Sequence, residues 1–147
     1  MIARLAALLI AALAPSAASA QAAPKPLFAD SATLRLTITG PIAEVAQTGG
    51  ANRQSRDALL TVAGETLPIQ ISPRGITRLK RDVCQFSPLR VSFVRAPGRA
   101  SVFAGQKQLK LVTHCRATPS FQQYVLLEYA AYRLYNQLTP LSFRARL

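Results

Sequence analysis

Hydrophobic and polar residues alternate with a period of two along most of this chain, a pattern typical of half-buried β-strands. The alternation predicts strands at residues 33–39, 59–62, 67–71, 76–81, 89–93, 107–115 and 141–147. Gly64 and Glu65 separate the second and third of these and predict a hairpin, while Pro68 favours the edge or the first residues of a strand. Residues 44–56 are polar and contain glycine, which predicts a surface loop.

A helical period replaces the alternation near residue 120 and predicts a helix that runs to about residue 138. Ser120 and Gln123 fit the capping box S-x-x-Q at its start, and Pro140 ends it. One face of this helix is aromatic and apolar, formed by Phe121, Tyr124, Val125, Tyr132 and Tyr135. Glu128 projects from the middle of that face, where an unpaired carboxylate is costly, so we expect a partner for it.

Together these elements predict an α+β domain over residues 33–147, in which a mainly antiparallel sheet packs against one aromatic-rich helix. The alternation of residues 141–147 continues to the last residue without a turn or a polar tail. We interpret the chain as the amino-terminal portion of a larger fold; a terminal strand paired inside the sheet is the alternative. An unpaired final strand would leave an exposed edge that invites association.

The first 20 residues have the features of a secretory signal peptide. Arg4 provides a positive charge, Leu5–Leu13 an apolar run, and Ala18-Ser19-Ala20 a cleavage site before Gln21. A membrane anchor is the alternative, but the run is too short to span a bilayer, and no other segment is long and apolar enough to do so. We therefore expect an exported protein, periplasmic or secreted, with a disordered segment over residues 21–32.

The chain is strongly basic, with 18 lysines and arginines against 6 acidic residues. Ten of the basic residues fall between residues 74 and 116, where Asp82 is the one acid. Such a field attracts polyanions, and in an exported protein these are anionic lipid head groups, phosphorylated envelope polymers or a nucleotide. The candidate contacts are Arg74, Arg78, Lys80, Arg81 and Arg90. A solvated basic surface without a specific ligand is the alternative, and the absence of any zinc-finger, RNP-type or helix-turn-helix pattern argues against sequence-specific nucleic-acid binding.

Cys84 and Cys115 are the two cysteines of the chain, and in an exported protein they predict a disulfide. A metal site with His114 is the competing interpretation, but it lacks a recognisable ligand spacing, so no metal is predicted. A Cys–His nucleophile is disfavoured because adjacent strand residues point to opposite faces. We expect a structural role for His114.

Three segments carry a resemblance to a known family: LPIQISPRGITRLKRDVCQFSPLRVSF, VFAGQKQLKLVTHC and QYVLLEYAAYRLYNQLTPLSFRARL. They resemble a family of uncharacterised secreted bacterial proteins with an R-G-N-x-R turn, a C-x-F-P-P-L-R strand, an L-K-L-V-T-H-C strand and an E-Y-L-A-Y-R helix. Ile76 stands where that turn has asparagine. More remotely, the order of parts is similar to the amino-terminal portion of CotH-like proteins, the spore-coat-type atypical kinases.

The kinase-like resemblance implies a nucleotide site with ATP and Mg²⁺, in which a strand lysine pairs with a glutamate of the following helix. Lys110 and Glu128 occupy those two positions, and Lys107 or Arg90 is an alternative partner. A buried ion pair that only orients the helix, or hydrogen bonds to tyrosine hydroxyls, is the structural interpretation. No acid other than Glu128 follows residue 116, so the chain as it stands lacks metal-binding aspartates and a catalytic base.

Two functions therefore stand as expectations. The first is the non-catalytic amino-terminal part of a CotH-like envelope protein. The second is a small basic domain that binds anionic envelope polymers or lipid head groups.

Overall fold

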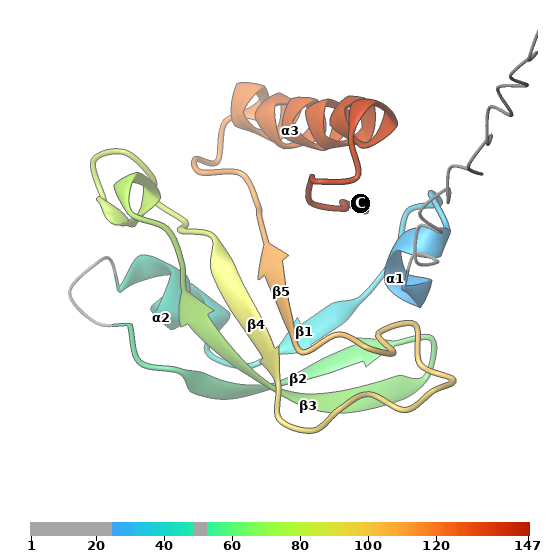
Figure 1. The fold of residues 1–147 in the computed structure, drawn as a ribbon. Helices are drawn as coiled ribbons and strands as arrows, with labels where there is room; N and C mark the ends of the chain where they lie inside the picture. The colour runs from blue at the N-terminus through green and yellow to red at the C-terminus, as the bar shows by residue number, and fades with distance from the viewer. Residues whose placement is uncertain (1–24, 49–52) are drawn as a thin grey trace, which may run out of the picture.

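A computed structural model describes residues 25–48 and 53–147, and the predicted signal peptide with its cleavage site lies outside these ranges. The fold is built on a five-stranded antiparallel sheet (Figure 1). Its strands follow one another in chain order: β1 (Thr37–Thr39), β2 (Arg56–Val62), β3 (Glu65–Pro73), β4 (Leu89–Phe93) and β5 (Gln108–Leu111). The predicted α+β class with an antiparallel sheet is confirmed.

The hairpin between β2 and β3 turns at Ala63 and Gly64, one residue earlier than expected. Both residues have positive φ, 46° and 83°, which suits the tight turns that join antiparallel strands. Pro68 lies within β3, a central strand, and not at an edge. Its carbonyl accepts a hydrogen bond from Val94, so its missing N–H faces the β4 side, just before the paired stretch that begins at Ile69. The Pro68–Val94 position therefore keeps one hydrogen bond and lacks the reciprocal one, which confines the loss to the end of the β3–β4 ladder.

The core lies on one face of this sheet, where the inward residues of each strand meet three other elements. Leu27 comes from α1 (Pro26–Ala29), Val45 and Ala46 from α2 (Ile42–Gln47), and Phe103 from the loop before β5. The strand residues buried with them are Ala58, Leu60, Val62, Ile69, Ile71, Leu89 and Val91. Burial of these side chains on a single face explains why the alternation predicted the strands so directly.

Three expectations for the connecting segments are wrong. The segment 44–56 is not wholly a loop, because α2 occupies its beginning and buries Val45 and Ala46. Residues 76–81 form the short 3₁₀ helix η1 (Thr77–Leu79) and not a strand, since Gly75 has a φ of 119° that ends extended structure there. Residues 25–32, part of the predicted disordered segment, contain α1 because Leu27 packs into the core.

The helix α3 (Pro119–Leu138) spans the predicted range, with Thr118 rather than Ser120 at its N-cap and no capping side-chain hydrogen bond. Pro119 begins it, a position that proline suits because its missing N–H needs no partner there. No residue of α3 is buried, so its aromatic face does not form the core expected against the sheet. The helix lies beyond the end of β5, apart from the core face (Figure 1).

The predicted strand over residues 141–147 is absent, and the chain instead folds back beneath α3 as an irregular segment (Figure 1). Its end is attached to the amino-terminal part of the domain. Arg146 donates hydrogen bonds to the carbonyls of Ala32 (2.8 Å) and Leu27 (3.2 Å) and to the carboxylate of Asp30 (2.9 Å). Leu34 N–H donates to the Leu147 carbonyl. We call these contacts the clasp.

The predicted disulfide is confirmed, with Cys84 and Cys115 joined at 2.11 Å. The Cys115 carbonyl also accepts hydrogen bonds from the N–H groups of Gln85 and Phe86. The segment between β5 and α3 is thus fastened to the segment before β4. Within the two described ranges, no helix combines the length and apolar character that crossing a bilayer requires.

Candidate functional site

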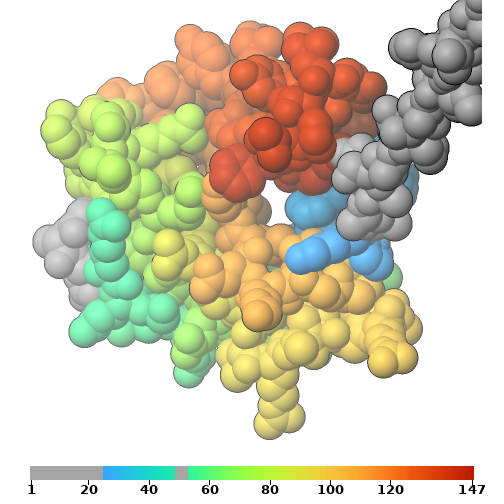
Figure 2. All heavy atoms as spheres, in the orientation of Figure 1, coloured from blue at the N-terminus to red at the C-terminus, as the bar shows by residue number. Residues whose placement is uncertain are grey.

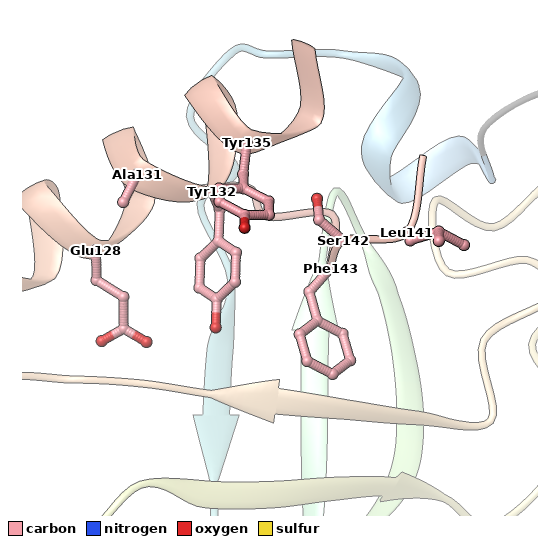
Figure 3. Close-up of a pocket in the computed structure, with 7 residues that line it drawn as sticks. All are labelled: Glu128, Ala131, Tyr132, Tyr135, Leu141, Ser142 and Phe143. Carbon is pink, nitrogen blue, oxygen red and sulfur yellow. The ribbon is translucent and has the colours of Figure 1, made fainter. Parts of the chain in front are cut away.

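A cavity of about 530 Å³ opens between α3 and the irregular C-terminal segment (Figure 3). It is lined by Glu128, Ala131, Tyr132, Tyr135, Leu141, Ser142 and Phe143. Figure 3 shows Glu128, Tyr132 and Phe143 projecting from these two segments toward the strand beneath them. In the space-filling view, the surface is hollowed below α3 (Figure 2). A cavity of this size is within the range of small-ligand sites.

A row of positive charges crosses the sheet next to this cavity. Arg90 on β4 and Lys110 on β5 are directly opposite each other in the antiparallel register, and Ser72 on β3 is opposite Arg90. Arg74 follows Ser72 by two residues and therefore projects to the same side while the chain remains extended. We call Arg74, Arg90 and Lys110 the cationic row.

The charges of the cationic row are not compensated within the domain. In the part of the chain that the structure describes, none of the three side chains forms an ion pair or a hydrogen bond with another residue. Like charges directly opposite on neighbouring strands repel each other. Burial, and secondarily the charge of Arg74, lower the pKa of Lys110 below its usual value of 10.5. An anion placed between these side chains would remove the repulsion.

Lys110 connects the cationic row to the cavity. Its ammonium nitrogen lies 3.1 Å from the centre of the Phe143 ring, a cation–π contact. The Phe143 ring in turn packs edge-to-face against Tyr132, with ring centres 6.3 Å apart. The cavity therefore has aromatic walls on one side and a cation at its border.

Glu128 pairs with Arg78 and not with Lys110 as the kinase-like resemblance implied. The Arg78 guanidinium lies 3.3 Å from the Glu128 carboxylate, because η1 places Arg78 beside α3. Both side chains are partly exposed, and an ion pair of this kind contributes at most about 1 kcal/mol to stability. The carboxylate at the cavity wall is thus neutralised by a residue 50 positions earlier.

The five predicted polyanion contacts divide into four groups. Arg74 and Arg90 join the cationic row, and Arg78 is paired with Glu128. Arg81 donates to the carbonyls of Gln47 and Gln85 and holds two loops together. Lys80 is exposed at the end of η1. Sequence reasoning missed Phe143 as a cavity residue, since its position was assigned to a strand.

A second, smaller hollow lies beside the disulfide. His114, Cys115 and Arg116 are among the residues that line it. Both cysteines are oxidised, so neither offers a thiolate to a metal or to a substrate. His114 is exposed, and the structural role expected of it stays a prediction.

Comparisons with models of known protein families, with curated proteins and with solved structures find no match for this chain.

Proposed function

We propose that this protein is an exported, non-enzymatic domain that binds phosphate-bearing anionic groups through the cationic row. The observation that carries the proposal is the cross-strand pair of Arg90 and Lys110, extended by Arg74, which forms no ion pair with a carboxylate in the part of the chain that the structure describes. Two cations held opposite each other by strand register raise the free energy of the unbound domain. A bound phosphate relieves this repulsion and gains charge-assisted hydrogen bonds from the same side chains.

The arrangement of the neighbouring charges supports the same function. Arg78, Arg81 and Arg146 each have an acceptor within the domain, so these arginines have a structural use. Among the described residues the side chains of the cationic row have no such acceptor, and Lys110 of the row contacts Phe143 at the edge of the open cavity. The signal peptide expected at the amino terminus would bring this row to envelope polymers and lipid head groups, which share phosphate chemistry.

A comparison of two double variants, each lacking two positive charges, tests the proposal. Arg90→Gln/Lys110→Gln removes two charges of the cationic row, and Arg95→Gln/Arg99→Gln removes two exposed charges from the loop after β4. Binding of inorganic polyphosphate is measured by calorimetry at several salt concentrations. We expect the first variant to bind at least about tenfold more weakly, because each cation near an anionic surface contributes about 1 kcal/mol, and the second to bind like the wild type.

Equal weakening of both variants would overturn the proposal, since it would describe a diffuse basic surface without a site. A further arm titrates ATP with and without Mg²⁺. Magnesium-dependent binding that is lost in Glu128→Gln would favour the kinase-like alternative instead, because Glu128 lies outside the cationic row.

A further inference from the structure

One side of α3 is an exposed apolar stripe, part of which borders the cavity. It consists of Tyr124, Leu127, Ala131, Leu134, Tyr135 and Leu138, which share one side of a helix that turns 100° per residue. Leu134 is 65% exposed and Leu138 is 73% exposed, although leucine is mostly buried in folded proteins. Leu141, which is 92% exposed, continues the stripe beyond the end of the helix.

The apolar stripe is continuous with the cavity and, through it, with the cationic row. Ala131, Tyr135 and Leu141 belong to the stripe and also line the cavity. Phe143, on the same cavity wall, contacts the ammonium group of Lys110. A ligand that covers this region therefore meets hydrocarbon on one side and positive charge on the other.

We infer that the apolar stripe and the cationic row together dock on the surface of an anionic phospholipid bilayer. This inference rests on the proposed function and names its ligand. In the bound state the phosphates contact Arg74, Arg90 and Lys110, while the leucines of the stripe enter the boundary between head groups and acyl chains. Amphipathic surfaces bind bilayers in this way, with a strength that grows with buried apolar area and with attraction to anionic lipids.

Charge complementarity favours a bilayer over a second copy of the chain. The chain has a formal net charge of +12, and two copies joined along the stripe would bring two cationic rows close together. The helix itself carries two charged residues, Glu128 and Arg133, of opposite sign. Insertion of its apolar side into a lipid interface thus requires little removal of charge from water.

Sedimentation with vesicles tests the inference. Vesicles of phosphatidylglycerol and phosphatidylcholine in equal parts are compared with vesicles of phosphatidylcholine alone. Leu134→Gln/Leu138→Gln disrupts the stripe, and Val94→Gln is the matched control, because Val94 is 55% exposed and follows the end of β4 that lies away from α3. Polyphosphate binding and the sedimentation velocity of each variant are measured in parallel.

We expect the wild type and Val94→Gln to sediment with the anionic vesicles. With the neutral vesicles, both proteins are expected to remain in the supernatant. Leu134→Gln/Leu138→Gln is expected to bind the anionic vesicles at least roughly tenfold more weakly, since each leucine loses the transfer energy of its side chain. Its polyphosphate binding is expected to be unchanged, because no member of the cationic row is altered.

Two outcomes would overturn the inference and leave the proposed function standing. One is anionic vesicle binding by the stripe variant that equals the wild type. The other is a wild-type dimer that the stripe variant converts to monomer, with no vesicle binding by either. Failure of the proposed function itself is a separate result, seen as polyphosphate binding that does not depend on Arg90 and Lys110.

Discussion

The ammonium group of Lys110 lies over the ring of Phe143, which brings the edge strand of the sheet against the C-terminal segment. Lys110 thus lies between an aromatic ring and the positive charge of Arg74, and its strand register places it opposite Arg90. Burial, and secondarily the charge of Arg74, lowers the pKa of Lys110, and this leads to the first of five predictions.

Replacing Arg74 by glutamine is expected to raise the pKa of Lys110 part of the way toward 10.5. The shift is partial because burial, the larger cause of the lowered pKa, remains. Titration of the lysine side chains followed by carbon NMR measures it. In Arg99→Gln, which removes an exposed charge from the loop after β4, the pKa of Lys110 is expected to stay unchanged.

The lowered pKa of Lys110 determines whether its contribution to the free energy of unfolding rises or falls with pH. Because the pKa of Lys110 is lowered by folding, the unfolded chain binds more protons once the pH rises through the folded pKa. The contribution of Lys110 to the free energy of unfolding therefore increases with pH up to about 10.5 and then levels off. The difference in the free energy of unfolding between the wild type and Arg74→Gln is expected to narrow as the pH rises to about 10.5. A difference that stays constant with pH would contradict the proximity of Arg74 to Lys110.

Arg146 secures the C-terminal segment, and we expect its removal to release that segment. Arg146→Ala deletes the hydrogen bonds to the carbonyls of Leu27 and Ala32, with an expected loss of about 1–3 kcal/mol in the free energy of unfolding. Urea denaturation provides the measurement. Arg144→Ala, at an exposed arginine two positions away, is expected to change stability by less than about 0.5 kcal/mol. Equal effects of the two variants would show that the clasp does not form.

The disulfide is expected to contribute about 3 kcal/mol, because it closes a loop between cysteines 31 residues apart in the unfolded chain. Cys84→Ala/Cys115→Ala removes it without leaving a free thiol. The free energy of unfolding of this variant is compared with that of the wild type with and without reductant. Reductant is expected to destabilise only the wild type, and a variant as stable as the oxidised wild type would refute the estimate.

Gly40 packs against β2, and the structure leaves no room for a side chain there. A Cβ atom at this position would lie 2.7 Å from the Cβ of Ala58, closer than two carbon atoms approach without displacement. Gly40→Ala is expected to destabilise the fold by about 1–3 kcal/mol. Gly98→Ala is the control, because nothing lies within 4 Å of an added Cβ there, and its effect is expected to be below about 1 kcal/mol. Thermal unfolding compares the two variants.

Much of the sheet could be predicted from sequence because each strand buries one face. The alternation at Leu89, Val91 and Phe93 places the first two in the core, and it therefore carries direct information about β4. Residues 141–147 alternate as clearly, yet they form no strand. They are held instead by the clasp, in which the Arg146 side chain binds a segment more than 110 residues earlier and the Leu147 carbonyl accepts from Leu34 N–H. Local pattern contains no information on such a contact.

The candidate site, too, was predictable where it depends on local sequence and not where it depends on tertiary contacts. The period of α3 placed Glu128 among aromatic residues, and Tyr132 does share the cavity with it. The partner of Glu128 could not be predicted, because Arg78 reaches it only through η1, where a strand was expected. The cationic row required the register of β3, β4 and β5, and that register is set by tertiary packing.

The order of the sheet has a consequence for how the chain folds. Every strand of the sheet pairs only with its neighbours in sequence, so the sheet can form without bringing distant parts of the chain together, which favours rapid folding. The clasp joins residues 119 positions apart and gains nothing until both ends of the domain are in place. It is therefore the contact expected to form after the transition state, and its strength sets the rate at which the domain opens rather than the rate at which it folds.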